Sequence, residues 1–334
     1  MARKRWAAAA ALAGGAAWCA RRAKKYPLAK GLWPVQLVSV PGGALNAATA
    51  RAGNALLRRM PAPKTPPDLV RAQRTADTPN GALRLTLYAP KNAAGPLPCL
   101  VYLHGGGFCF EEAGYLVRNV MDYARGARCL VVFVHYRTSD RAPFPAAFDD
   151  ACSALRYVWE HSDALDVDRT RIAVGGDSAG GALAASCAQW ARDETDIRLC
   201  FQLLVYPVTD MRMATASMRA GADTPCWNAR LDRRMWKLYL RKGLCGRPAA
   251  YASPLLAENF AGLPPAYIET EAFDCLRDEG LAYAKALRRA GVPVQSAQRT
   301  GTFHGFDMCR GARAAHRAMR SRIGALRRAF GQEE

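Results

Sequence analysis

The chain has 334 residues, half of them hydrophobic and 22% charged, so intrinsic disorder and low-complexity architecture are excluded as its main organisation. Its formal net charge of +19 lies at the two ends: residues 1–75 carry +13, residues 310–334 carry +5, and the body between them carries +1. A neutral body argues against a nucleic-acid-binding protein, because such proteins cluster their basic residues on the folded surface.

The basic N-terminal segment, residues 1–75, is expected to be separate from the main fold. Its first 25 residues hold seven Lys or Arg and no acid around an apolar stretch at residues 6–20, which is shorter than the ~20 residues that span a bilayer. Charges directly after the stretch, and the lack of a small-x-small site, argue against a cleaved signal peptide. Three interpretations stay open, namely a weak contact of residues 1–25 with an anionic membrane surface, a signal segment, and a poorly ordered or partly helical tail. Prolines between Pro61 and Pro67 predict a linker.

The eleven cysteines are odd in number and scattered, with no C-x-x-C pair and no Cys/His cluster of zinc-ligand spacing. Several lie inside apolar runs, where a thiol behaves as a small hydrophobic side chain. We therefore expect reduced core cysteines, a cytoplasmic location and no metal site.

From residue 82 the apolar pattern alternates between strands and helices. Such an alternation predicts a mostly parallel central sheet with helices on both faces. Residues 209–250, rich in Met, Trp and Arg, interrupt it and are expected to be an insertion. The core is thus expected in two parts, residues 76–208 and 251–334. Strands are predicted at 83–88, 99–103, 130–134, 171–174, 200–206 and 266–269, and helices at 148–159, 182–190, 279–290 and 312–330.

A G-x-S-x-G pattern at residues 176–180 stands between a predicted strand and a predicted helix. Such a strained turn presents a nucleophilic serine, here Ser178, and its glycines allow close approach of the backbone. A phosphate-binding or merely tight turn is the alternative, although no P-loop pattern is present.

Three glycines, Gly105, Gly106 and Gly107, follow His104 directly after the strand at 99–103. Their unshielded amides are what an oxyanion hole requires. Because the candidate nucleophile Ser178 follows downstream, we expect the oxyanion-hole amides to come from this loop and from Ala179, the residue after the nucleophile. His104 is expected to hold the loop by hydrogen bonding.

A general base must come from five histidines. We favour His304, which lies in a glycine-flanked loop after the last strand and follows a plausible acid in the order Ser, Asp, His. Asp274 is the favoured acid because it comes first in its loop. The neighbouring Asp278 and Glu279 are better explained as first-turn charges of the next helix.

Together, the motifs HGGGF, GDSAGG, DCLRDEG and FHGF resemble the hormone-sensitive-lipase family of α/β-hydrolases, over about residues 83 to 309 and in the family's order. The resemblance implies an α/β-hydrolase fold and a triad of Ser178, Asp274 and His304. It also implies an oxyanion hole chiefly at Gly106 and Gly107 with Ala179, and a helical lid built from an N-terminal segment and the insertion at 209–250. Departures from the family's usual motifs, such as Arg141 and Cys275, bear on loop packing and substrate preference.

The expected function is a serine carboxylesterase that cleaves small to medium acyl esters through an acyl-enzyme. No cofactor or metal is expected. The expected partner is a small-molecule ester substrate, with no nucleic acid and with a weak membrane-surface contact through residues 1–25 kept open. Trp227, Trp236 and Tyr239 suggest an apolar pocket. Two alternatives are kept, an amide hydrolase like the arylacetamide deacetylases with the same triad, and a non-catalytic ligand receptor. The latter is disfavoured because His304 is present.

Overall fold

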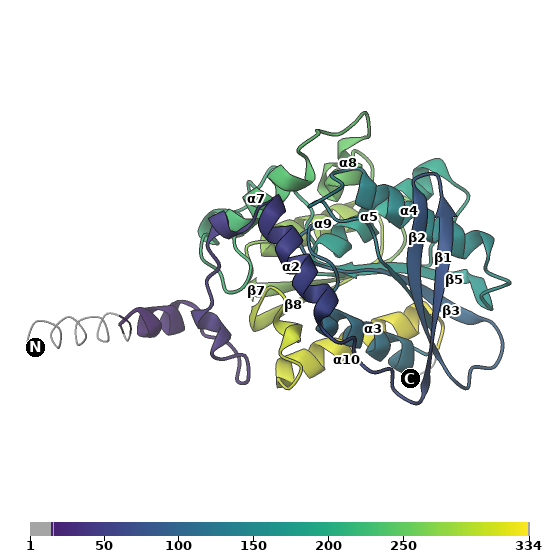
Figure 1. The fold of residues 1–334 in the computed structure, drawn as a ribbon, viewed down its shortest axis with the longest axis horizontal. Coiled ribbons are helices and arrows are strands. Elements are labelled where there is room, and N and C mark those ends of the chain that lie inside the picture. The colour runs from purple at the N-terminus through teal and green to yellow at the C-terminus, as the bar shows by residue number, and fades with distance from the viewer. Residues whose placement is uncertain (1–14, 16, 333–334) are drawn as a thin grey trace, which may run out of the picture.

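An eight-stranded, mostly parallel β-sheet lies at the centre of residues 15 and 17–332, the part of the chain that this computed structural model describes (Figure 1). Its strand order is β1-β2-β4-β3-β5-β6-β7-β8. Only β1 and β2 break the parallel arrangement, since β2 pairs antiparallel with both β1 and β4. The strands are β1 (Leu69–Thr78), β2 (Gly81–Pro90), β3 (Leu97–Leu103), β4 (Leu130–Val134), β5 (Val167–Asp177), β6 (Phe201–Val205), β7 (Ala266–Phe273) and β8 (Val294–Phe303).

Helices cover both faces of the sheet, as the alternating pattern predicted (Figure 1). On one face lie α4 (Ala146–Glu160), α5 (Ala179–Glu194) and α9 (Arg277–Arg289), and on the other α3 (Gly114–Gly126) and α10 (Arg313–Ala329). Strands β3, β4 and β6 are almost wholly buried because their continuous apolar runs pack against helices on both sides.

Strand β1 was not predicted. It crosses the expected boundary at residue 75: residues 69–75 lie in the basic segment and residues 76–78 in the expected core. Only Leu69 and Ala76 of its ten residues are buried, because β1 is an edge strand paired with β2 alone. A strand with so little buried surface leaves a weak hydrophobic pattern.

The N-terminal segment reaches the body through short elements. Residues 17–25 are helical, followed by η1 (Val35–Leu37), η2 (Gly42–Ala44) and α2 (Ala47–Arg59). Asn46 and Thr49 form a capping box that fixes the start of α2. Most of the predicted apolar stretch at 6–20 lies outside the described residues. Within the described part, no helix is long and apolar enough to cross a bilayer.

The insertion at 209–250, here called the lid segment, connects β6 to the region before β7. It carries α6 (Ala216–Ala220) and α7 (Ala229–Tyr239). Asn228 caps α7 by accepting from the backbone amides of Arg230 and Leu231, both at 3.1 Å. At the end of the lid segment, α8 (Ala249–Ala252) and then η3 (Pro254–Leu256) lead back toward the sheet, and η4 (Phe306–Met308) follows β8.

Candidate active site

Ser178 stands on the sharp turn between β5 and α5. Its backbone has φ 56° and ψ −120°, a conformation that costs free energy for a residue with a side chain. The Ser178 amide donates to the carbonyl of Val205 on the neighbouring strand at 2.9 Å, which holds this strained turn in place. The turn therefore has the geometry expected of a nucleophile elbow.

The glycines of the elbow are required by close backbone contacts. A Cβ on Gly180 would lie 2.0 Å from the carbonyl oxygen of Leu103, and one on Gly176 would lie 2.4 Å from the backbone of Gly180. Neither position has room for a methyl group. The tight crossing of β3 and α5 brings the loop after β3 close to Ser178.

His304 lies between Ser178 and Asp274 and contacts both. The Ser178 hydroxyl lies 2.8 Å from Nε2 of His304, and Nδ1 of His304 donates to the Asp274 carboxylate at 2.7 Å. A carboxylate can only accept, so the proton sits on Nδ1 and leaves Nε2 free to accept the serine proton. Burial lowers the pKa of His304, but the charge and hydrogen bond of Asp274 outweigh it, so that the pKa is raised above 6.5.

Of the three candidate acids, the structure brings only Asp274 to the histidine. Asp274 is further held by the Leu276 amide, which donates to it at 2.9 Å. Asp278 instead accepts from the amide of Ser217 in the lid segment at 2.7 Å. Glu279, although in the first turn of α9, is fully buried and accepts from the amide of Thr209 at 2.6 Å. Its burial was not anticipated, since a first-turn acid is usually exposed.

The glycine loop after β3 brings Gly106 and Gly107 to the cavity that contains Ser178. Both have positive φ, 124° and 58°. Ala179 is the first residue of α5, so its amide has no acceptor within the helix. Gly105, unlike Gly106 and Gly107, is absent from the cavity wall, and a Cβ placed on it would lie 2.2 Å from the carboxylate of Asp177.

His104 supports the loop rather than the reaction centre. Its ring stacks on Tyr136 with centroids 4.2 Å apart, and its Nδ1 donates to the Gly105 carbonyl at 2.7 Å. Burial lowers the pKa of His104 to about 4, so the ring is neutral at neutral pH. The Tyr136 hydroxyl donates to the His104 carbonyl at 2.6 Å, which fixes the loop from a second side.

A cavity of about 300 Å³ opens above Ser178 and His304. This volume is at the lower end of the range for small-molecule pockets. Its wall is mostly apolar and comes from three parts of the chain: Val40, Ala44 and Leu45 of the N-terminal segment, Cys226, Trp227 and Leu231 of the lid segment, and Phe110, Tyr115, Tyr206 and Met308 of the core.

Of the three lid aromatics that the sequence suggested for the pocket, only Trp227 lines the cavity. Trp236 and Tyr239 are buried and pack on Phe108, with Tyr239 stacked at 3.9 Å between centroids. That expectation was wrong for these two, because one helical face of α7 anchors the lid segment to the core, and hydrophobicity alone does not separate an anchor from a pocket wall.

Two buried carboxyl groups near the site were not singled out from the sequence. Asp177, next to Ser178, accepts from the Tyr102 hydroxyl at 2.9 Å. Asp232 of α7 accepts from the indole N–H of Trp227 at 3.1 Å. Burial raises the pKa of each to about 7. Among residues 15 and 17–332, no three His, Cys, Asp or Glu side chains are grouped so as to hold a metal ion.

Comparison with known proteins gives evidence about the family of this chain that is independent of the site geometry. A family model described as alpha/beta hydrolase fold matches residues 100–308. Esterase LipI of Mycobacterium tuberculosis is 37% identical, over 75% of this chain and 79% of the relative. Carboxylesterase NlhH of the same species is also 37% identical, over 80% and 86%. Among solved structures, a bacterial heroin esterase superposes with a TM-score of 0.84 at 34% identity, over 92% of this chain and 99% of that one.

Proposed function

This chain belongs to the alpha/beta-hydrolase family of the hormone-sensitive-lipase type and is a carboxylic-ester hydrolase, and we propose that Ser178, His304 and Asp274 are its catalytic triad. The observation that carries the proposal is the continuous chain of hydrogen bonds from the Ser178 hydroxyl through His304 to Asp274. This is the arrangement by which a neutral imidazole activates a serine hydroxyl.

In the proposed reaction, Nε2 of His304 takes the proton of Ser178 as the Ser178 oxygen attacks the ester carbonyl. Asp274 stabilises the imidazolium that forms. The same Nε2 then gives the proton to the departing alcohol, which leaves an acyl group on Ser178. Water attacks this acyl-enzyme as His304 takes its proton, and His304 then returns the proton to the Ser178 oxygen as the bond to the acyl group breaks and the acid leaves.

We assign the oxyanion hole to the backbone amides of Gly106, Gly107 and Ala179. The support is the place of Gly106 and Gly107 in the cavity wall and of Ala179 directly after Ser178 at the start of α5. Amides in these roles stabilise the negative charge on the carbonyl oxygen, and loss of one such donor typically costs about 10²–10³-fold in kcat. Gly105 is not included, since its position against Asp177 supports a role in the shape of the loop.

The proposed substrates are esters of small to medium acids. The support is the volume of about 300 Å³ and the apolar wall of Leu45, Leu231 and Met308, which favours a short aliphatic or aryl group over a long lipid chain.

We also propose that residues 209–250 act as a lid together with part of residues 1–75. Arg22 and Lys25 form ion pairs with Asp223 of the lid segment at 3.1 and 2.6 Å, and the Tyr26 hydroxyl donates to the same carboxylate at 2.7 Å. These contacts support a link between the N-terminal segment and the cover of the cavity.

A contact between residues 1–25 and an anionic membrane surface is proposed on charge alone, and with it a cytoplasmic enzyme that associates reversibly with the inner leaflet. Seven bases and no acid lie in this stretch. Bases next to a membrane contribute about 1 kcal/mol each at an anionic surface, so that several suffice for salt-sensitive binding.

The catalytic proposal is tested by labelling the purified protein with a fluorophosphonate, followed by kinetics on p-nitrophenyl esters of increasing acyl length and on p-nitroacetanilide. We expect labelling at Ser178, short-chain esters as the best substrates and slow anilide hydrolysis. Labelling of a residue other than Ser178 would overturn the assignment, and a preference for long chains would overturn the proposed substrate size.

A further inference from the structure

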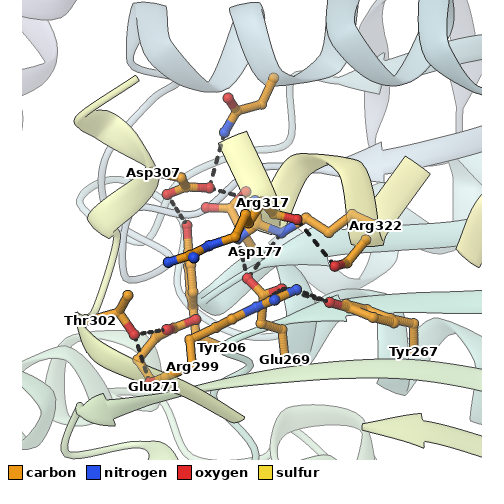
Figure 2. Close-up of polar contacts among 12 residues, drawn as sticks. Asp177, Tyr206, Tyr267, Glu269, Glu271, Arg299, Thr302, Asp307, Arg317 and Arg322 are labelled. Atoms are coloured by element: carbon orange, nitrogen blue, oxygen red, sulfur yellow. Dashed lines mark hydrogen bonds and ion pairs between the residues drawn. The ribbon is translucent and has the colours of Figure 1, made fainter. Parts of the chain in front are cut away.

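Arg322 of α10 is 1% exposed and lies in the interior, where it contacts two carboxylates (Figure 2). Its Nη1 donates to Asp307 at 2.6 Å. Its Nε donates to Glu269 at 3.0 Å, and its Nη2 contacts the same carboxylate. Burial raises the pKa of Glu269, but Arg322 and Arg299 outweigh this and hold the pKa below its usual value, so Glu269 is ionised at neutral pH.

The two carboxylates belong to the two chain segments that carry the histidine and the acid of the proposed triad. Glu269 lies on β7, the strand that leads to Asp274. Asp307 lies in η4, three residues after His304. One guanidinium therefore joins both segments from behind the site, through bonds that are all buried.

Asp307 continues this network to the histidine ring. The Tyr206 hydroxyl donates to Asp307 at 2.8 Å (Figure 2). The ring of Tyr206 lies 4.7 Å from the ring of His304, between centroids. The Tyr206 amide donates to the Glu269 carbonyl at 2.8 Å, so its backbone is held by the same strand that Arg322 binds.

A buried ion-pair network of this kind is a weak source of stability. Removing a guanidinium and a carboxylate from water costs several kcal/mol per ion, and an apolar replacement of similar volume is often as stable. Directional hydrogen bonds, by contrast, fix the relative placement of the segments they join. In acyl transfer, displacement of a catalytic group by about 1 Å can cost on the order of 10²-fold in rate.

We propose that Arg322, Asp307 and Tyr206 are positioning residues that hold the His304 imidazole in line between Ser178 and Asp274. This inference rests on the proposed triad. Arg322 sets the distance between the loop of His304 and the strand of Asp274, and the Tyr206 hydroxyl, anchored on Asp307, keeps its ring against the imidazole.

The sharpest test compares two buried tyrosines of the same network. Tyr206→Phe removes the hydroxyl that donates to Asp307. The control Tyr267→Phe removes one that donates to Glu269 at 2.7 Å. In the described part of the chain the aromatic rings against His304 are those of Tyr206 and Trp227, not that of Tyr267.

Tyr206→Phe loses one hydrogen bond, that to Asp307, whereas Tyr267→Phe loses two, because the Tyr267 hydroxyl also accepts from Arg299 at 2.8 Å. The control should therefore lose at least as much thermal stability. Only Tyr206→Phe should reduce kcat, by about fivefold if the lost bond is worth ~1 kcal/mol, with KM within twofold and an equal fall in the fluorophosphonate labelling rate.

A second series replaces the guanidinium. Arg322→Met should lower kcat more than Tyr206→Phe, and Arg322→Lys should restore part of the loss because an ammonium can still bind one of the two carboxylates. Where Arg322→Met does not fold, the tyrosine pair decides. Wild-type kcat and labelling rate in Tyr206→Phe, or an equal loss in Tyr267→Phe, would overturn the inference. Failure of the wild-type protein to label at Ser178 would instead overturn the triad itself.

Discussion

The indole N–H of Trp227 donates to the carboxylate of Asp232 at 3.1 Å, and this bond fixes the tryptophan that closes one side of the cavity. A Cβ placed on Gly107 would lie 2.8 Å from the far edge of the Trp227 ring, so the ring packs directly on the loop assigned to the oxyanion hole. The position of Trp227 therefore bears on which acyl groups fit beside Ser178.

Trp227→Ala is expected to enlarge the cavity and shift the acyl preference to longer chains. Each additional methylene that finds apolar contact contributes about 0.8 kcal/mol, or about fourfold in kcat/KM. The measurement is a p-nitrophenyl ester series from acetate to octanoate. Trp236→Phe is the control, since Trp236 is buried away from the cavity: it should lower thermal stability and leave the preference unchanged. An unchanged optimum in Trp227→Ala would show that Trp227 does not limit acyl length.

The pH profile should follow the charge state of His304. The base must be neutral, so kcat/KM rises with pH through the pKa of His304, and because that pKa is raised the midpoint should lie above 6.5. Asp232, in its ionised form above its own pKa of about 7, is among the groups that raise the pKa of His304, so Asp232→Asn should move the midpoint toward lower pH. The measurement is kcat/KM between pH 5 and 9 for the wild type and Asp232→Asn. A wild-type midpoint below 6.5, or a midpoint that moves to higher pH in the variant, would contradict the prediction.

Ser178→Ala should abolish turnover by several orders of magnitude and leave on the order of 10³-fold over the uncatalysed rate from the oxyanion hole and binding. His304→Ala should be comparably severe, and the double variant should be no worse than either alone because the two residues act as a unit. Turnover of a soluble ester and thermal melts are the measurements. Near-normal activity in folded Ser178→Ala protein would exclude Ser178 as the nucleophile.

Asp274→Asn and Asp278→Asn should separate orientation of the base from stability. Asp274→Asn should keep the fold and lose activity by about 10⁴-fold, because the amide no longer favours the proton on Nδ1 of His304. Asp278→Asn should retain turnover and destabilise the fold by about 1 kcal/mol, since Asp278 interacts with Ser217 and the first turn of α9. Kinetics and melts on both proteins test this, and the reverse outcome would exchange the two roles.

Two N-terminal truncations should separate membrane contact from the lid. Deleting residues 1–14 removes Arg3, Lys4 and Arg5 but keeps both ion pairs to Asp223, so it should weaken salt-sensitive binding to vesicles of anionic lipid and leave kcat/KM unchanged. Deleting residues 1–25 removes those ion pairs as well and should also alter acyl preference. Co-sedimentation at low and high salt, with ester assays, gives both readouts. Full-length protein that fails to bind at low salt would refute the membrane contact.

The sequence by itself determined the inner sheet and the elbow. Strands β3, β4 and β6 are continuous apolar runs because they are covered on both faces. The glycines on either side of Ser178 are required because a Cβ at Gly176 or Gly180 would lie within 2.4 Å of backbone atoms. Both signals are local, since one comes from burial along a few residues and the other from a single turn. The order of the motifs along the chain then indicated which histidine and acid to expect.

Only the tertiary structure decided which side chains share the space around the site. Trp227 lines the cavity while Trp236 packs in the core, although both are apolar residues of one segment. Arg322 and Glu279 look like ordinary surface charges of amphipathic helices, yet both are buried. The physical reason is that a polar group is stable in the interior only when partners distant in the sequence meet it there, as Asp307 and Glu269 meet Arg322 and the amide of Thr209 meets Glu279.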